Sequence, residues 1–187
     1  MRSFNPCSIV QRLSQPYRLM IRSCVASTIA LGLTACAIGD MATIAPDTPL
    51  DTIIQAYGTP SQTCTTETGQ QRVLWTQQPM GQYAWATNVT PDGRAERVEL
   101  VLSDTYFERL REGVWTPERV LCTFGPPAKK ETIGLPSLTQ YVWSYRYREN
   151  STWNSLMYVN FGTDGKHVVR FGPGPDPLYA RDGFWLD

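Results

Sequence analysis

The sequence is poor in the residues that most catalytic and metal sites require. Histidine occurs once, at His167, and no cysteine or acidic cluster accompanies it in the sequence. Metal binding and acid–base catalysis both need partner groups, so we expect His167 to be an exposed residue at a strand end. A hydrolase built from Cys64 or Cys122 with His167 has no local signature. The chain also lacks a Gly-x-Ser-x-Gly elbow, a Walker loop and a zinc-binding helix motif, so we expect no enzyme, no metal and no cofactor.

Long apolar runs and basic stripes are also missing. The apolar segment over residues 24–33 is well short of the roughly 18–20 residues that a membrane-spanning helix needs. No stripe of Lys and Arg favours a nucleic-acid partner. All acidic residues follow residue 35, whereas four arginines precede it, so the remainder of the chain is mildly acidic.

The N-terminal region does contain the pattern of an export signal. Its arginines precede the apolar segment, and Leu33-Thr34-Ala35-Cys36 follows it. This tetrapeptide resembles the bacterial lipobox, whose cysteine receives diacylglycerol and becomes the new N-terminus. The resemblance implies a lipoprotein signal peptide over 1–35, lipidation of Cys36 and a lipidated tether over 36–47. Two or more acyl chains would anchor the protein stably on a membrane.

Three further points concern the lipidation, the start codon and the membrane to which the protein is sorted. An ordinary signal peptide that merely ends at a cysteine would leave Cys36 without lipid. The initiator is either Met1 or Met20, because Met20-Ile21-Arg22 is a more typical start than the long polar stretch before it. By the general sorting rule of bacterial lipoproteins, Ala37 in place of Asp favours the periplasmic face of the outer membrane.

Two further cysteines, Cys64 and Cys122, follow the lipobox. An even pair in an oxidising compartment is consistent with a disulfide. Two buried free thiols are the alternative, because free cysteine is commonly a core residue. Their spacing alone does not decide between these.

An internal repeat sets the expected architecture. Residues 49–60 and 116–127 match at a constant offset of 67, and each has apolar residues at helical spacing. Both copies have a threonine that can cap the helix and a glycine that can end it with positive φ. These residues are Thr48, Gly58, Thr116 and Gly125.

Three strands are expected after each of these helices. They are Arg72–Gln77, Gln82–Thr90 and Arg94–Leu102 in the first copy, and Gln140–Arg148, Leu156–Phe161 and Lys166–Phe171 in the second. An Asp-Gly hairpin turn separates the second and third strands of each copy. We therefore expect an α+β fold of two tandem units, with short helices packed on three-stranded antiparallel sheets. The first helix–three-strand repeat covers 48–102, and 103–187 holds an additional helix, the second repeat and a C-terminal tail.

The strand before residue 149 is the best candidate for a contact surface. Strict alternation places its four aromatic residues on one face. Such a row is either core against the helices or a binding face, because Tyr, Trp and Arg are common interface anchors. We favour core for Trp143 and predict protein contacts for Tyr145, Tyr147 and Arg148.

The second copy carries motifs of a known family. These are Thr116-x-x-x-Val120, Phe124-Gly125-Pro126-Pro127, Val142-Trp143-x-Tyr145 and Asp164-Gly165. Over 103–171 the chain resembles the SmpA/OmlA family, small outer-membrane lipoproteins that include the accessory lipoprotein of the β-barrel assembly machine. Val114-Trp115 stands where the family has a single Met, and the tandem copy resembles instead the architecture of β-lactamase inhibitor protein.

The resemblance implies a non-enzymatic outer-membrane lipoprotein that binds proteins during envelope or β-barrel outer-membrane protein assembly. Its partners would be the membrane, through the lipid on Cys36, and envelope proteins such as the β-barrel assembly machinery, without nucleic acid. The alternative is a binder or inhibitor of another envelope enzyme that uses the concave face of two tandem sheets. The matching residues are helix ends, turns and core aromatics, so they indicate fold more than partner.

Overall fold

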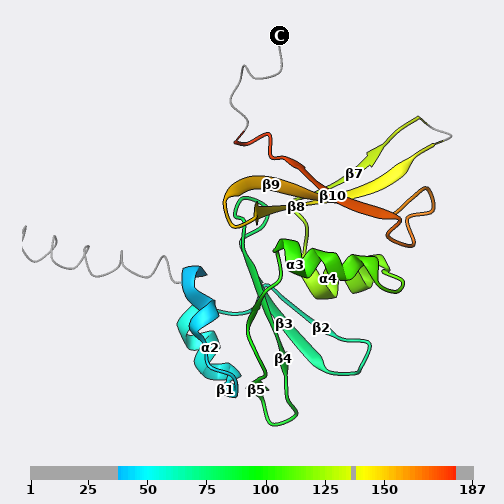
Figure 1. Cartoon of the computed structure of the whole chain (residues 1–187). Helices are drawn as coiled ribbons and strands as arrows, with labels where there is room; N and C mark the ends of the chain where they lie inside the picture. The colour runs from blue at the N-terminus through cyan, green and yellow to red at the C-terminus, as the bar shows by residue number, and fades with distance from the viewer. Residues whose placement is uncertain (1–37, 136–137, 180–187) are drawn as a thin grey trace, which may run out of the picture. The chain divides into compact units, whose positions relative to one another are not determined.

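The computed structural model describes residues 38–135 and 138–179, and from Asp40 onward these belong to one compact unit (Figure 1). The expected signal peptide over 1–35, Cys36 and both candidate initiators, Met1 and Met20, lie outside the described residues. Within the described ranges, no helix has the length and apolar character needed to cross a membrane.

The first repeat forms one antiparallel sheet with a helix on one face. Its sheet has the order β1-β5-β4-β3-β2, and β6 pairs with β4 beside β5. The elements are η1 (Ile38–Thr43), β1 (Thr48–Pro49), α2 (Leu50–Tyr57), β2 (Gln62–Thr65), β3 (Gln71–Thr76), β4 (Ala84–Val89), β5 (Arg94–Ala95) and β6 (Glu99–Leu100).

The second repeat likewise places a helix, α4, directly before its strands, but α3 and η2 precede that helix where the first repeat has β1. Its antiparallel sheet runs β10-β9-β8-β7, so each strand pairs with its neighbour in sequence. The elements are α3 (Asp104–Phe107), η2 (Glu108–Arg111), α4 (Pro117–Phe124), β7 (Lys129–Ile133), β8 (Gln140–Glu149), β9 (Trp153–Asn160) and β10 (Arg170–Pro175). The α+β class is confirmed.

The prediction of three strands per copy is wrong, because each copy has one more strand directly after its helix. These additional strands are β2 and β7, which lie at the edges of their sheets. Their sequences, QTCT and KKETI, lack a buried apolar face, and every residue of β7 is exposed or only partly buried. Lysine-rich edge strands resist pairing with other chains, but a search for apolar alternation does not detect them.

The strand predicted over Arg94–Leu102 is interrupted by a bulge. Ala95 pairs with Val89 of β4, whereas Glu99 pairs with Ala86. Three steps along β4 therefore face four steps along the partner, which is the one-residue excess of a β-bulge. The extra residue divides the predicted strand into β5 and β6.

The helix ends agree largely with the repeat. Gly58 and Gly125 both end their helices with positive φ, 83° and 82°, as predicted. Thr116 caps α4, since its hydroxyl accepts a hydrogen bond from the backbone N–H of Arg119 at 3.3 Å. The prediction for Thr48 is wrong, because its hydroxyl donates to the carbonyl of Ala45 instead.

The layers alternate between helices and sheets (Figure 1). One face of the first sheet packs with α2 and η1 in a cluster that includes Ile53, Val73 and Trp75. Its other face shares a larger core with α3, η2, α4 and the inner face of the second sheet. Leu74 and Val120 belong to this shared core. In the described residues, helices therefore fill the space between the facing sides of the two sheets, and these sides form core rather than an open concave face.

Candidate functional site

Tyr145 and Tyr147, predicted to contact proteins, are both completely buried. Their rings pack against Phe107 of α3, at centroid distances of 6.1 and 5.3 Å. The Tyr145 hydroxyl donates to the carbonyl of Gly125 at 3.0 Å, and the Tyr147 hydroxyl donates to Asp104 Oδ1 at 3.1 Å. The prediction is wrong for both, because the helices of the second repeat cover this face of β8. Burial raises the pKa of both phenols.

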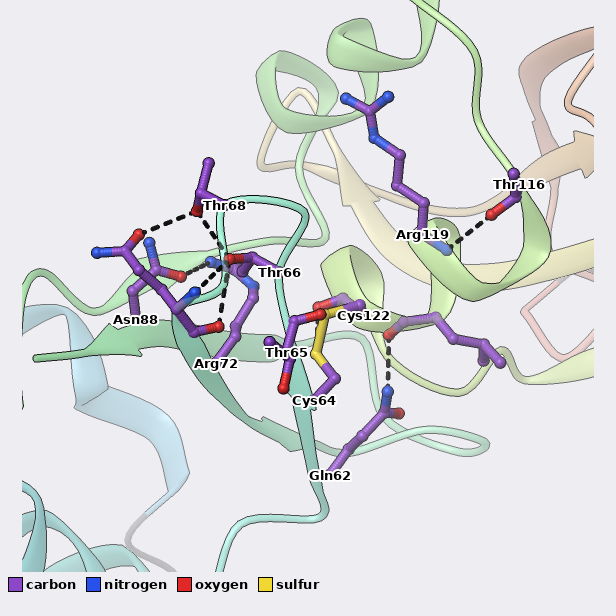
Figure 2. The surroundings of a disulfide bond; sticks show 12 residues. Gln62, Cys64, Thr65, Thr66, Thr68, Arg72, Asn88, Thr116, Arg119 and Cys122 are labelled. Carbon is purple, nitrogen blue, oxygen red and sulfur yellow. Dashed lines mark hydrogen bonds between the residues drawn. A yellow bond between two sulfur atoms is a disulfide. The ribbon is translucent and has the colours of Figure 1, made fainter. Parts of the chain in front are cut away.

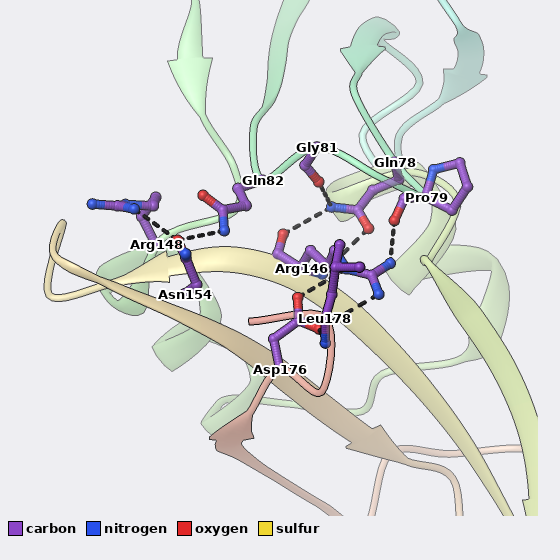
Figure 3. Close-up of polar contacts among 9 residues, drawn as sticks. All are labelled: Gln78, Pro79, Gly81, Gln82, Arg146, Arg148, Asn154, Asp176 and Leu178. Atoms are coloured by element: carbon purple, nitrogen blue, oxygen red, sulfur yellow. Dashed lines mark hydrogen bonds and ion pairs between the residues drawn. The ribbon is translucent and has the colours of Figure 1, made fainter. Parts of the chain in front are cut away.

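Arg148 lies on the opposite face of β8 and is half-buried. Its Nη1 donates to Asn154 Oδ1 at 2.7 Å, and the same oxygen accepts a hydrogen bond from Gln82 Nε2 at 2.6 Å (Figure 3). Gln82 comes from the first repeat, so this contact joins the two repeats. The predicted protein contact of Arg148 stays a prediction.

Beside this contact, Gln78 joins the first repeat to the backbone of β8. Pairing of β8 with β7 ends at Ser144. Beyond it, Gln78 Nε2 donates to the carbonyl of Arg146 at 2.8 Å, and the N–H of Arg146 donates to Gln78 Oε1 at 3.2 Å (Figure 3). The amide side chain therefore occupies the place of a paired strand. Arg146 itself forms an ion pair with buried Asp176, at 2.8 Å.

His167 is exposed, as expected, but it lies in the loop between β9 and β10 rather than on a strand. The strand β10 begins only after this loop. Before it begins, the N–H of Val168 donates to the carbonyl of Trp115, at 2.9 Å, instead of to a neighbouring strand. Among the residues that the structure describes, no three His, Cys, Asp or Glu side chains gather in a way that could hold a metal ion.

Cys64 and Cys122 form a disulfide between β2 and α4, with a Cα–Cα distance of 5.8 Å (Figure 2). Gln62 Nε2 reinforces the connection by donating to the carbonyl of Leu121 at 3.0 Å. The bond closes a sequence separation of 58 residues. It therefore ties the edge of the first sheet to the helix of the second repeat.

A cavity of about 600 Å³ lies beside the disulfide. Its walls come from the end of β2 and the turn after it, from β3 and β4, from α3, η2 and the loop after them, and from α4. The charged lining residues are Arg72, Arg109, Arg119, Glu67, Glu112 and Glu118, and the remaining lining residues are Thr65, Thr66, Thr68, Asn88, Tyr106, Trp115, Thr116, Cys122 and Thr123. Both repeats contribute, so the cavity exists only in the folded tandem.

Aromatic rings and hydrogen bonds hold the three guanidinium groups. The Arg109 guanidinium lies 3.9 Å from the ring centroid of Tyr106, and that of Arg119 lies 4.1 Å from the ring centroid of Trp115. Such cation–π contacts fix the position of a charge that still faces solvent. Arg72 is more deeply placed, with 7 % of its surface exposed. Its Nη2 donates to the Tyr106 hydroxyl at 2.8 Å, and its Nη1 donates to Asn88 Oδ1 at 3.0 Å.

The carboxylates of the cavity differ in how they are engaged. Glu67 forms an ion pair with Arg119, at 3.5 Å. Glu118 sits in the first turn of α4, where a backbone N–H and the Thr116 hydroxyl lower its pKa. Hydroxyl groups dominate the rest of the lining, and the one sulfur there, that of Cys122, is already in the disulfide. This arrangement suits recognition by charge and hydrogen bonding.

Comparison with protein-family models, curated proteins and solved structures finds no match to the chain. The resemblance to the SmpA/OmlA family therefore rests on the sequence motifs alone. None of those motifs marks the cavity, because its walls come from residues far apart in the chain. Arg72, directly before the apolar run Val73-Leu74-Trp75 of β3, was the sequence signal that could have indicated it.

Proposed function

We propose that this chain is a non-enzymatic lipoprotein on the periplasmic face of the outer membrane, which binds proteins during envelope or β-barrel outer-membrane protein assembly. The Leu33–Cys36 lipobox supports the lipid anchor. The disulfide between Cys64 and Cys122 supports export, because such bonds persist in oxidising compartments.

The observation that carries the binding role is the cavity between the two repeats. It presents charges held in place by aromatic rings, together with threonine hydroxyls. Its phenol, on Tyr106, is engaged with Arg72 and Glu99, and burial raises the pKa of that phenol. These groups are placed to recognise a partner. A tether of about a dozen residues would keep the site near membrane partners and raise their effective concentration.

The β7–β8 hairpin supplies a second surface suited to proteins. Exposed apolar side chains occur at Ile133, Leu135, Leu138 and Tyr141, with 42 to 68 % of their surface accessible. Clustered exposed apolar residues commonly mark interaction sites. A binder of another envelope enzyme remains the second candidate, and this hairpin replaces the concave face as its contact surface.

Lipidation is tested by labelling cells with a radioactive fatty acid. Wild type and Cys24→Ser should take up label, because Cys24 lies outside the lipobox. Cys36→Ser should remain an unlabelled precursor that leaves the detergent phase. Equal labelling of Cys36→Ser would overturn the anchor.

Partner binding is tested by affinity capture from detergent-solubilised envelopes. Subunits of the β-barrel assembly machine should co-purify with wild type. Capture should weaken in a Leu135→Ser/Leu138→Ser variant and persist in Met80→Ser, which alters an equally exposed apolar residue on a different loop. Recovery of one unrelated enzyme in their place would favour the second candidate.

A further inference from the structure

The charges of the cavity do not all balance locally. Arg119 has Glu67 as its ion-pair partner, and Glu118 is engaged by the start of α4. Arg72 and Arg109 lie on the two sides of Tyr106, one at its hydroxyl and one over its ring. Within the described parts of the chain, neither of these two arginines has a carboxylate within ion-pair distance.

Arg72 makes this imbalance costly. The residue is more than nine-tenths buried, and its Nε is a buried donor without a hydrogen-bond partner. The groups that it does contact, the Asn88 amide and the Tyr106 hydroxyl, carry no formal charge. Each donates in turn to a carboxylate, that of Glu96 or Glu99, so Arg72 meets negative charge only through these neutral groups. A buried charge is stabilised best by an opposite charge in direct contact, which an anion in the cavity would supply.

We propose that the cavity binds a peptide through a carboxylate group that is held by Arg72 and Arg109. The proposal rests on the proposed function, since it names the part of a protein partner that this site recognises. A guanidinium presents paired donors in the geometry of a carboxylate.

The charge of the lining favours a carboxylate over a phosphate. The lining holds three arginines and three glutamates, and Glu99 is hydrogen-bonded to Tyr106 beside it. A phosphate monoester carries about −1.5 to −2 at neutral pH and would bring more negative charge to these glutamates than a carboxylate would.

The size of the cavity selects a peptide over a lone carboxylate ion. About 600 Å³ lies within the usual range for ligand sites and far exceeds the volume of one carboxylate group. Threonines 65, 66, 68 and 123 line the remaining space with hydroxyl groups, which can hydrogen-bond to peptide groups. The carboxylate belongs either to the C-terminus of the peptide or to an Asp or Glu side chain.

Binding is measured on the purified full chain by the NMR shift of the Trp115 indole and by calorimetry. The probes are acetyl-trialanine with a free carboxylate, acetyl-Ala-Asp-Ala-amide, acetyl-trialanine amide, sodium acetate and inorganic phosphate. One or both carboxylate peptides should give saturable shifts, and preference between them identifies the source of the carboxylate. Acetate should bind more weakly than the peptides, and the amide should not bind. Binding of neither carboxylate peptide, equal binding of the amide, or tighter binding of phosphate would overturn the proposal.

Two variants with the same change in charge locate the site. Arg109→Gln, at an exposed side chain, should weaken the better carboxylate peptide at least about tenfold, because a hydrogen bond to a charged group is lost. Arg97→Gln should leave the affinity unchanged, since Arg97 is exposed and is not among the residues that line the cavity. Both variants should melt near the wild-type temperature. Equal losses in the two variants would contradict the assignment.

These experiments distinguish a failure of the cavity proposal from a failure of the proposed function. If Arg109→Gln still captures β-barrel assembly subunits while Leu135→Ser/Leu138→Ser does not, and the carboxylate peptides fail to bind, the cavity proposal fails and the binding function stands. If the carboxylate peptides bind but no envelope partner is captured, the proposed function fails.

Discussion

The hydroxyl of Tyr145 donates a hydrogen bond to the carbonyl of Gly125, the residue that ends α4. The first repeat has an equivalent contact, because the indole N–H of Trp75 donates to the carbonyl of Gly58 at the end of α2, at 2.8 Å. In both repeats an aromatic side chain of the second strand thus holds the end of the preceding helix. The two repeats share this contact although the aromatic residue differs.

Gly58 and Gly125 provide a matched pair for stability. Both have φ near 82° and ψ near 180°, a region that only glycine adopts readily, so either alanine variant should lose about 1–3 kcal/mol. Gly125→Ala should lose more, because its Cβ would lie 2.7 Å from Leu74 Cδ2, whereas no atom lies within 4 Å of a Cβ at position 58. Urea denaturation measures the difference. A larger loss for Gly58→Ala would contradict the packing of Leu74 on α4.

Tyr147 and Arg148 are adjacent but should respond very differently to truncation. Tyr147→Ala removes a fully buried ring and its bond to Asp104, so we expect a loss of about 3–5 kcal/mol. Arg148→Ala removes a half-buried side chain whose acceptor, Asn154, keeps its bond from Gln82, and should cost less than about 1 kcal/mol. Thermal unfolding distinguishes the two, and similar melting temperatures would show that Tyr147 is not core.

The disulfide should contribute substantially to the free energy of unfolding. Closing a loop of 58 residues stabilises by roughly 4 kcal/mol in the chain-entropy model. A Cys64→Ala/Cys122→Ala variant should therefore unfold at lower urea concentration than wild type and be insensitive to dithiothreitol. Wild type treated with dithiothreitol should approach the variant, and an unchanged midpoint would show that the bond does not form in solution.

The buried tyrosines predict weaker stability at alkaline pH. Burial raises the pKa of Tyr145 above its ordinary value of 10.0, so above pH 10 the unfolded chain loses this proton while the folded chain keeps it. Stability is fully present below pH 10 and falls as the pH rises, by about 1.4 kcal/mol per pH unit for each such group. Tyr145→Phe should have a shallower slope above pH 10, and Tyr179→Phe, at an exposed position, should match wild type. Identical slopes for all three proteins would contradict the burial of this phenol.

Local chemistry made much of the fold predictable. The glycines at 58 and 125 indicated helix ends from their place in the repeat, and the structure confirms their positive φ. β7 was not predicted, because an exposed, lysine-rich edge strand lacks the alternation of apolar and polar residues that indicates a strand. Strict alternation correctly placed Tyr145 and Tyr147 on one face of β8. It could not indicate that Phe107 and Phe124, from helices earlier in the chain, cover that face.

The candidate site was less predictable than the fold. Arg72 and Arg109 are 37 positions apart in the sequence and meet only through Tyr106. No sequence motif indicates such a contact, because the contact depends on how the two repeats pack against each other. The pairing of Cys64 with Cys122 was open for the same reason until the distance between β2 and α4 was known.

The placement of α4 makes the two repeats depend on each other. This helix belongs to the second copy, yet Val120 and Phe124 share a core with Leu74 of the first sheet as well as with Tyr145 of the second. Deletion of either copy would therefore expose apolar surface that the other covers. Neither repeat is a free-standing module, although the sequence reads as two copies of one unit.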